Sequence, residues 1–299
     1  MNLLEGKTLS KEILTSLESR IEKVKNALNR PPSLTIINYY ADSASAIYVK
    51  RKIKICERLG IKTDLINPGE DKGYSYFLEL LNRLQEDSSI DAIMIERPLP
   101  DGYEDIKTWN TFGSLKDVDG LSSLSMGKLF ISKTMSEIEK GDFFVPCTAL
   151  AVIKMIRKYS IDIKGANIAV AGRSSIVGRP LAHMLTGMDA TVTLCHSKTK
   201  DIASIFKKAD IIISAVGKAR WIKADMVGEN SILIDVGTNI DENGKMCGDM
   251  DFEDLKDKAQ SLTPVPGGVG PVTLACLLEN VVKAAEKKAL SINEVDCVK

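Results

Sequence analysis

One lysine stands where an amphipathic helix would present only apolar side chains. On a helix over 44–59, at about 100° per residue, Lys52 lies in the middle of the apolar arc, one turn after Tyr48, and Ser45 shares this face. A lysine placed there extends its ammonium to solvent, pairs with an acid or faces a cleft. Because the hydroxyls of Tyr48 and Ser45 would be costly to bury in a dry core, we favour a cleft.

Two acidic positions could be partners of this lysine. Glu96 directly follows the expected strand 92–95, and Asp119 lies in the turn Asp117-Val-Asp-Gly120. A carboxylate beside Lys52 would stabilise its ammonium form and disfavour it as a base. An aspartate-rich turn can also reflect turn chemistry alone, and both interpretations of Asp119 stay open at this point.

A glycine turn follows the expected strand 168–171. In such a turn, backbone N–H groups and the start of the next helix can bind a pyrophosphate. The spacing differs from GxGxxG, so an ordinary strand–helix connection is the alternative. The candidate residues of this turn are Gly172, Arg173, Ser174, Ile176, Val177 and Gly178.

The next expected strand, 191–195, ends without an acid. Folds that bind NAD usually place Asp or Glu there, on the ribose hydroxyls. Here His196, Ser197 and Lys198 follow the strand, and with Arg173 they offer donors and positive charge to a ribose phosphate. The sequence therefore predicts NADP rather than NAD, with a solvated strand end as the alternative for His196.

Small residues follow two further expected strands, 211–215 and 232–236, and fill a proline- and glycine-rich loop near 264–271. Ligands of open α/β sheets bind outside the carboxyl ends of strands, and glycine lets a planar ring approach the backbone. The loop is either a rigid wall of the site or a plain connector. These candidates are Ala215, Val216, Gly217, Asp235, Gly237, Thr238, Pro266, Gly267 and Gly268.

The elements that must position these residues alternate in two blocks. Apolar residues from Leu9 to Leu28 recur at steps of three and four and predict one long helix. Irregular sequence is expected from 98 to 126, and the second block begins near Ala149. The other expected elements are strands 34–38 and 62–66, a helix over 74–86 and a last helix over 273–287.

This alternation predicts parallel sheets with right-handed crossovers. The expected fold class is α/β, with two three-layer α/β domains, the second a Rossmann-like NADP-binding domain with a parallel sheet. We expect residues 1–143 with the C-terminal helix 273–299 to form the folding unit around Lys52. Residues 144–272 would form the cofactor domain.

Composition excludes several other classes of protein. The 299 residues carry 40 basic and 40 acidic side chains, so no global field favours nucleic acid or an anionic membrane. No apolar run reaches the roughly 18 residues of a membrane span. The six cysteines form no CxxC pair, which argues against a metal site or a disulfide framework and suits a reducing cytoplasm.

These features resemble the methylenetetrahydrofolate dehydrogenase/cyclohydrolase family over nearly the whole length of the chain. Six stretches in order across two domains are hard to obtain by chance. They are Ser45-Ala-Ile-Tyr-Val-Lys-Arg-Lys52-Ile-Lys54, Lys116-Asp-Val-Asp-Gly120, Pro146-Cys-Thr148, Gly172-Arg-Ser-Ser-Ile-Val-Gly-Arg-Pro180, Thr191-Val-Thr-Leu-Cys-His-Ser197 and Thr263-Pro-Val-Pro-Gly-Gly-Val-Gly-Pro-Val-Thr273.

The resemblance implies NADP-dependent oxidation of 5,10-methylenetetrahydrofolate to the 5,10-methenyl form in a cleft between the domains. In most members the same site then hydrolyses the product to 10-formyltetrahydrofolate. By matching position, Lys52 is the catalytic lysine, Tyr48 its partner on the ring-binding face, and Asp119 the carboxylate that holds the pterin. Ser45, Pro98 and the 266–268 loop would also contact the folate. The family is usually a homodimer joined through the cofactor domain, with its last helix packed on the first domain.

The chain departs from the family's usual Gln-Leu-Pro-Leu run, where it has Glu96-Arg97-Pro98-Leu99. If Glu96 holds Lys52 as an ammonium, the dehydrogenase step is kept and hydrolysis is weakened or lost. If Arg97 pairs with Glu96 instead, Lys52 is free. The loops at 39–43 and 121–125 also differ from the family pattern. Both are expected to border the folate pocket.

Two readings outside this activity remain. A shikimate-type NADP dehydrogenase would share the cofactor domain, and a sensor that binds NADP without catalysis would need only that domain. The Lys-Asp-Val-Asp-Gly and Pro-Val-Pro-Gly-Gly-Val-Gly-Pro stretches argue against the first. Tyr48, Lys52 and Asp119 argue against the second, because a sensor has no use for them.

Overall fold

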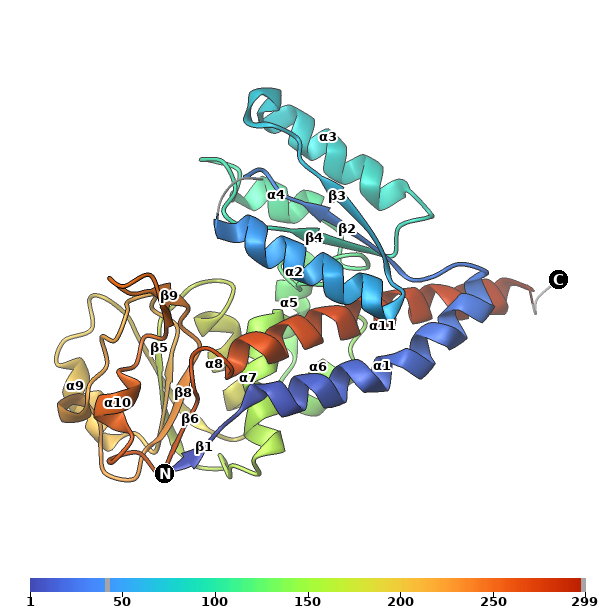
Figure 1. Cartoon of the computed structure of the whole chain (residues 1–299). Helices are drawn as coiled ribbons and strands as arrows, with labels where there is room; N and C mark the ends of the chain where they lie inside the picture. The colour runs from blue at the N-terminus through green and yellow to red at the C-terminus, as the bar shows by residue number, and fades with distance from the viewer. Residues whose placement is uncertain (41–43, 297–299) are drawn as a thin grey trace. The chain divides into compact units, whose positions relative to one another are not determined.

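The chain folds into two compact units, and each is described by itself. The structure is a computed structural model that describes residues 1–40 and 44–296, without the side chains of 44–47, 70 and 292–296. Unit 1 comprises Met1–Lys11, Leu129–Lys140 and Pro146–Cys276, and unit 2 comprises Glu12–Lys128, Gly141–Val145 and Leu277–Lys299. Figure 1 labels their helices and strands.

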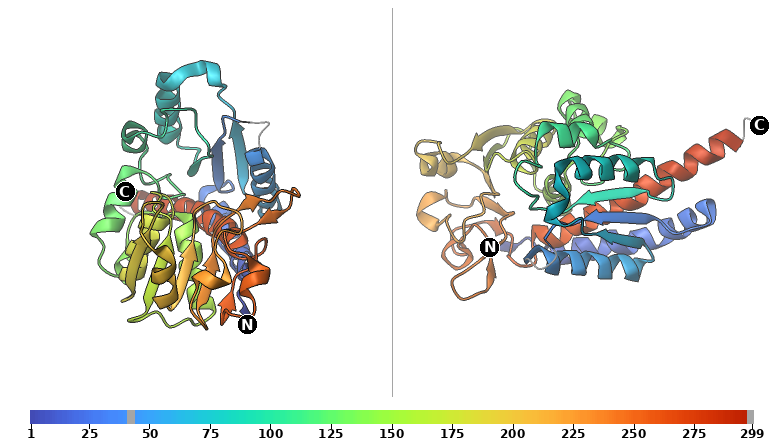
Figure 2. Two further views of the ribbon diagram at one scale, coloured as in Figure 1. Left: turned by 90° about the vertical axis from the view of Figure 1, so that its left-hand side faces the viewer. Right: turned by 90° about the horizontal axis from the view of Figure 1, so that it is seen from above.

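Unit 1 is built on a six-stranded sheet in which every pairing is parallel, as Figure 2 shows. The order is β1-β11-β8-β7-β5-β6. The bounds are β1 Asn2–Leu3, β5 Asn167–Ala171, β6 Thr191–Cys195, β7 Ile211–Ser214, β8 Ile232–Asp235 and β11 Ser261–Leu262. Ala171 pairs with both Cys195 and Ser214, and Ser214 pairs with Asp235. Four strands therefore end together at one edge, where the sequence predicts the cofactor site.

Helices cover both faces of this sheet. α7 (Cys147–Lys158) packs on α8 (Gly178–Thr186), and α8 packs on β5 and β6. On the other face lie α9 (Ile202–Lys208), the 3-10 turn η2 (Ala224–Met226) and α10 (Phe252–Leu255), which enclose a core around Phe206, Leu233 and Leu262. α6 (Met135–Lys140) and a two-stranded hairpin, β9 (Asn239–Ile240) with β10 (Met246–Cys247), complete the unit. The α/β class with a parallel sheet is confirmed.

Unit 2 holds a smaller parallel sheet in the order β3-β2-β4. Its strands are β2 (Ser33–Ile37), β3 (Lys62–Ile66) and β4 (Ala92–Ile95). α2 (Ala44–Leu59) connects β2 to β3, and η1 (Glu70–Lys72) with α3 (Gly73–Glu86) connects β3 to β4. Right-handed crossovers in opposite directions place α2 and α3 on opposite faces, as Figure 1 shows.

Two long helices supply further core to unit 2. α1 (Gly6–Leu28) buries Leu17, Ile21 and Val24, and α11 (Val269–Asp296) buries Val281 and Val282. Arg20 of α1 forms a two-bond fork with Glu286 of α11, at 2.8 and 2.7 Å. The last helix is therefore longer than the predicted 273–287, and its part beyond Leu277 belongs to unit 2.

The prediction of irregular sequence over 98–126 is wrong in two places. α4 spans Ile106–Thr111, and α5 spans Ser123–Ile131. Asp105 caps α4 by accepting a hydrogen bond from the Thr108 N–H. A six-residue helix repeats its apolar positions too few times to be read from periodicity, and its cap was the only local signal. The two-residue strands β1 and β11 were missed for the same reason.

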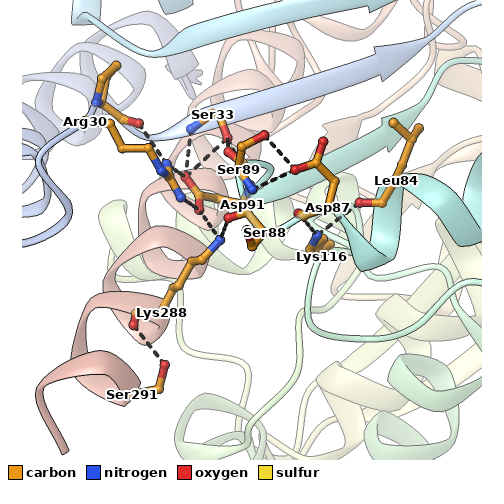
Figure 3. Close-up of polar contacts among 11 residues, drawn as sticks. Arg30, Ser33, Leu84, Asp87, Ser88, Ser89, Asp91, Lys116, Lys288 and Ser291 are labelled. Carbon is orange, nitrogen blue, oxygen red and sulfur yellow. Dashed lines mark hydrogen bonds and ion pairs between the residues drawn. The ribbon is translucent and has the colours of Figure 1, made fainter. Parts of the chain in front are cut away.

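A buried ionic cluster joins α11 to the end of the small sheet at which β2 and β4 begin (Figure 3). The side chain of Asp91 is fully buried, and the Arg30 guanidinium donates to its two oxygens at 2.7 and 2.6 Å. The Ser33 N–H donates to the same carboxylate at 2.9 Å, and Lys288 of α11 lies 3.5 Å from it. Burial alone raises the pKa of Asp91, but the bonds from Arg30 and Ser33 outweigh it and hold that pKa below its usual 3.8.

No helix in the described part of the chain is both long and apolar enough to cross a membrane. The five cysteines among the described residues are buried. Burial raises the pKa of the Cys56 thiol to about 11 and also raises the pKa of the Cys195 and Cys247 thiols. These three are therefore poor nucleophiles. Cys147, at the start of α7, is a core side chain as well.

Candidate active site

Lys52 and Glu96 form an ion pair on unit 2. The ammonium nitrogen lies 2.5 Å from a Glu96 carboxylate oxygen, and the two side chains are only 16% and 10% exposed. Lys52 comes from the third turn of α2, and Glu96 follows the last residue of β4. Of the three outcomes considered for a lysine on the apolar arc, the structure shows pairing with an acid.

Tyr48 lies one turn before Lys52, and its side chain is exposed, at 37%. An aromatic ring left in solvent beside a shielded ion pair is suited to packing against a flat ligand. Ser45 lies in the first turn of α2, but its side chain falls outside the described residues. Residues 41–43, in the loop that departs from the family pattern, also fall outside them.

Arg97 pairs with Glu104 and leaves Glu96 paired with Lys52. Its guanidinium donates to Glu104 at 2.8 Å and lies 5.2 Å from the centre of the Trp109 ring. The peptide bond from Arg97 to Pro98 is cis, and Pro98 is exposed. The hypothesis that Arg97 would free Lys52 is therefore wrong for this arrangement, because the loop turns the arginine toward its own residues.

The two aspartates of the acidic turn have different environments. Asp117 is fully buried and accepts from the N–H groups of Leu121 and Ser122, at 3.0 and 2.7 Å. Burial raises the pKa of Asp117, although these hydrogen bonds act in the other direction. Asp119 is half-buried. Turn chemistry therefore accounts for Asp117, and Asp119 remains the candidate for a ligand.

The acidic turn is fastened on three sides within unit 2. Lys116 donates to the carbonyls of Leu84 and Asp87 at the end of α3, at 3.0 and 2.6 Å (Figure 3). Asn280 of α11 donates to the Val118 carbonyl at 2.8 Å. A Cβ at Gly120, where φ is +68°, would lie 2.4 Å from the Val145 backbone. Asp119 is thus carried on a rigid turn, and sequence reasoning missed these supports because they come from distant elements.

The glycine turn of unit 1 has the shape of a phosphate cradle. Gly172 has a φ of +114°, and a Cβ there would lie 2.4 Å from the Ala215 carbonyl oxygen. A Cβ at Gly178 would lie 1.8 Å from the Gly172 carbonyl oxygen. Val177, at the N-cap of α8, makes no side-chain cap, and its own N–H donates to the Ser174 hydroxyl at 3.2 Å. Ile176 is half-buried in this turn.

Positive and donor side chains surround the end of β6. Arg173, Ser174, Ser197 and Lys198 are exposed, and among the described residues no carboxylate pairs with either cation. The ring Nδ1 of His196 accepts from the Lys198 N–H at 3.1 Å. In the neutral ring the proton is then on Nε2, which can donate to a phosphate oxygen. The next acid along the chain, Asp201, caps α9 by accepting from the Ser204 N–H.

Two buried carboxylates lie near the ends of β7 and β8 and accept hydrogen bonds from backbone N–H groups. Asp235 is the last residue of β8, and Asp249 follows β10. Asp235 accepts from the N–H groups of Gly237 and Met250, at 2.9 and 2.8 Å. Burial raises the pKa of Asp235 to about 7, while its hydrogen bonds oppose the shift. The structure therefore does not offer the Asp235 side chain to a ligand. Around it, Ala215 and Val216 are half-buried, Gly217 and Thr238 are exposed, and Gly237 is buried.

The second of these carboxylates, Asp249, was not predicted. It lies in the run Gly248-Asp-Met-Asp251, which in sequence resembles an ordinary polar turn. The only signal available was the glycine before it. Its contacts come from residues 10 to 35 positions away.

The proline- and glycine-rich loop lies in unit 1. The peptide bond from Val265 to Pro266 is cis, and Gly267 has a φ of +114°. The Gly267 carbonyl accepts from the Gly6 N–H at 2.8 Å, and a Cβ at Gly268 would lie 2.6 Å from the Pro264 carbonyl oxygen. The loop is therefore rigid, and Pro266 at its tip is exposed.

Comparison with known proteins identifies both halves of the chain. Residues 4–119 match the catalytic domain of tetrahydrofolate dehydrogenase/cyclohydrolase, and residues 146–289 match the NAD(P)-binding domain of that family. The bifunctional protein FolD of Elusimicrobium minutum is 46% identical over 96% of this chain and 99% of its own.

Solved structures agree with these matches. The bifunctional FolD methylenetetrahydrofolate dehydrogenase/cyclohydrolase of Campylobacter jejuni has a TM-score of 0.90 at 40% identity, over 96% of this chain and 99% of its own. The Trypanosoma brucei enzyme, solved with NADP cofactor and an inhibitor, has a TM-score of 0.86 at 30% identity, over 95% and 97% of the two chains.

Proposed function

The chain belongs to the tetrahydrofolate dehydrogenase/cyclohydrolase family, and we propose that it runs both reactions of that family. It oxidises 5,10-methylenetetrahydrofolate to 5,10-methenyltetrahydrofolate with NADP and hydrolyses the product to 10-formyltetrahydrofolate. The observation that carries this proposal is Lys52, held with its ammonium shielded from solvent beside an exposed Tyr48 on one face of α2.

Each candidate on unit 2 has a role suited to its surroundings. Tyr48 packs on the folate ring, and Lys52 holds or moves a proton at Nζ next to the one-carbon bridge. Asp119 accepts hydrogen bonds from the N–H groups of the pterin. Ser45 and Pro98 border the same ligand. On unit 1, the rigid loop with Pro266, Gly267 and Gly268 supplies a further wall.

NADP, when bound, accepts the hydride of the dehydrogenase step. The residues of unit 1 fit this cofactor, because the Gly172–Gly178 cradle has no space for a Cβ and exposed donor side chains follow Gly172 and β6. Arg173, Ser174, His196 and Ser197 bind the ribose phosphate. The backbone at 215–217 and 237–238 borders the rest of the dinucleotide.

Hydrolysis makes a stronger demand on Lys52 than oxidation does. A water molecule must lose a proton during its attack on the methenyl carbon, and a positioned side chain must take that proton. The Glu96 carboxylate holds the Lys52 ammonium in an ion pair, and Nζ must leave that pair to take part in this transfer. We therefore place the cyclohydrolase, and not the dehydrogenase, as the step that Glu96 limits.

Further assignments complete the proposal. Residues 1–143 with 273–299 bind folate, and residues 144–272 bind NADP. The enzyme works in the cytoplasm, which the buried cysteines suit. It forms a homodimer through the cofactor domain, where the outer edge of β6 has no strand partner among the described residues. A sedimentation mass of two chains would support the dimer, and a mass of one chain would overturn it.

The experiment that tests the activity uses purified protein and both one-carbon substrates separately. With methylenetetrahydrofolate, NADP should be reduced to NADPH, and NAD should be reduced to NADH far more slowly. With methenyltetrahydrofolate alone, decay should be faster than in buffer. Absence of NADPH formation would reject the dehydrogenase, and decay at the buffer rate would reject the cyclohydrolase.

A further inference from the structure

We propose that Asp249 is a positioning residue that shapes the NADP-binding surface formed by the loops after β7 and β8. This inference rests on the proposed function, because it takes those loops to contact the cofactor. Asp249 is fully buried, so it would act through the loops that it holds.

Each of the two carboxylate oxygens of Asp249 accepts two hydrogen bonds. Oδ2 accepts from the Ser214 hydroxyl at 2.9 Å and from the Val216 N–H at 2.7 Å. Oδ1 accepts from the Lys218 N–H at 2.9 Å and from the Asn239 side-chain amide at 3.0 Å. One side chain thus joins the end of β7, the turn that follows it and the start of β9.

Asp249 is in turn held by Asp235 at the end of β8. The N–H groups of Asp249 and Met250 donate to the two Asp235 oxygens, at 3.0 and 2.8 Å. Two glycines permit this close approach. A Cβ at Gly237 would lie 2.3 Å from the Asp249 carboxylate, and a Cβ at Gly248 would lie 1.9 Å from an Asp235 oxygen. The position of the Asp249 carboxylate is therefore fixed from both sides.

The turn over 215–218 wraps around this carboxylate. Because the N–H groups of Val216 and Lys218 point inward to Asp249, Gly217 becomes the exposed tip, with a φ of +68° and open space where a Cβ would stand. The Ala215 carbonyl at the base of the turn lies against Gly172 of the phosphate cradle. A shift of this turn would therefore change the cradle and the surface beside it together.

The replacement Asp249→Asn tests this link with little change in size. The amide keeps one acceptor oxygen, so two of the four donors lose their acceptor. We expect the dissociation constant for NADPH, measured by its fluorescence on the unliganded protein, to rise about tenfold or more. The KM for NADP should rise in parallel, and the KM for methylenetetrahydrofolate should stay within about twofold of wild type.

Two control variants separate positioning from loss of stability. Asp251→Asn makes the same change two residues away, at the N-cap of α10, where asparagine is also a good cap, and should bind NADPH normally. Ile156→Ala loosens the core of unit 1 from α7, outside the turn over 215–218. If Ile156→Ala lowers the unfolding temperature as much as Asp249→Asn and weakens NADPH binding equally, the role of Asp249 is only structural.

The outcomes are distinct. Wild-type protein that fails to bind NADPH would reject the proposed function itself. Wild-type binding together with unchanged affinity in Asp249→Asn would overturn only the positioning role. If Asp249→Asn does not fold, Ser214→Ala, which removes one donor and keeps the carboxylate, should raise the NADPH dissociation constant about threefold. Unchanged affinity in that variant would overturn the inference.

Discussion

The Glu96 carboxylate accepts a hydrogen bond from the Lys52 ammonium. This contact determines how Lys52 can take part in proton transfer. A neutral amide in its place would orient Lys52 without fixing its charge. The pair is well shielded, so solvent screens the attraction only in part. Because Arg97 is bound to Glu104, no second cation weakens the hold of Glu96 on Lys52 in the described residues.

Glu96→Gln should raise the cyclohydrolase rate. The amide still accepts a hydrogen bond from Lys52 but no longer stabilises the ammonium, so the proton leaves more easily. We expect a rise of about threefold to tenfold in methenyltetrahydrofolate hydrolysis, with dehydrogenase activity changed less than twofold. The matched control is Glu104→Gln, which changes a carboxylate in the same segment that pairs only with Arg97. Equal hydrolysis by wild type and Glu96→Gln would count against the role assigned to Glu96.

Asp235 should make stability depend on pH near neutrality. Burial raises its pKa in the folded protein to about 7, whereas in the unfolded chain it titrates near 3.9. The folded state therefore prefers the protonated carboxyl, and the free energy of unfolding falls as pH rises from about 4 to about 7 and then levels off.

Urea unfolding of wild type and Asp235→Asn at several pH values checks this expectation. The asparagine variant cannot titrate at this position, so its stability relative to wild type should improve as pH rises from about 4 to about 7 and then stay constant. A difference in unfolding free energy that is the same at every pH reflects the loss of a backbone contact and does not affect the test. Parallel curves for the two proteins across this range would show that Asp235 stays ionised.

At the scale of elements, the stability of unit 2 depends on the ionic cluster around Asp91, just before β4 (Figure 3). Arg30→Ala should cost about 3 kcal/mol of unfolding free energy, because it leaves a fully buried carboxylate without its two-bond partner. Lys288→Ala should cost less than about 1 kcal/mol, because that contact is longer and partly exposed. Urea unfolding of the two variants measures the contrast. Equal losses would mean that Lys288 contributes as much to the cluster as Arg30, against this account.

The turn between β5 and α8 makes a second prediction for an element. Gly178→Ala should weaken NADPH binding at least tenfold, since its Cβ would meet the Gly172 carbonyl at 1.8 Å and force the cradle open. Gly187→Ala, at the other end of α8, is the control, because its Cβ would meet neighbours only at 3.4 Å. NADPH fluorescence titration compares them. Normal binding by Gly178→Ala would show that the cradle does not hold the cofactor.

The elements that could be predicted from sequence are those long enough to show a period. The bounds of α2, β3, β4 and β6 agree with the prediction, because each has clear patterning and a turn signal at its ends. α4, β1 and β11 have six residues or fewer and depend on tertiary contacts for their existence. No local pattern could indicate that Asn2–Leu3 would join a sheet beside Ser261–Leu262.

Of the site, sequence could indicate the residues with unusual chemistry for their position. Lys52 on an apolar arc and Glu96 after a strand are such residues, and the structure brings them together. The sequence could not indicate which of Asp117 and Asp119 is buried in the turn, since both fit a polar turn. Asp249 was missed because its role depends on four hydrogen-bond donors, which only the folded chain brings together around its carboxylate.

At the scale of the whole molecule, one chain carries two domains of the same family and one set of catalytic candidates for two reactions. The balanced charge of 40 basic and 40 acidic residues leaves anion binding to local groups such as Arg173 and Lys198. In the proposed function the two activities share Lys52, but each requires a different property of it. Oxidation needs close placement of the reactants, and hydrolysis needs proton transfer.

The most direct test of this account is one reaction followed at two signals. Purified protein is mixed with methylenetetrahydrofolate and NADP, and the absorbances of NADPH and of the methenyl product are recorded together, with Lys52→Met as the matched variant. We predict that NADPH appears and that the methenyl species is consumed faster than it decays in buffer, while Lys52→Met loses this consumption. Absence of NADPH, or methenyl decay at the buffer rate in the wild-type protein, would contradict the account.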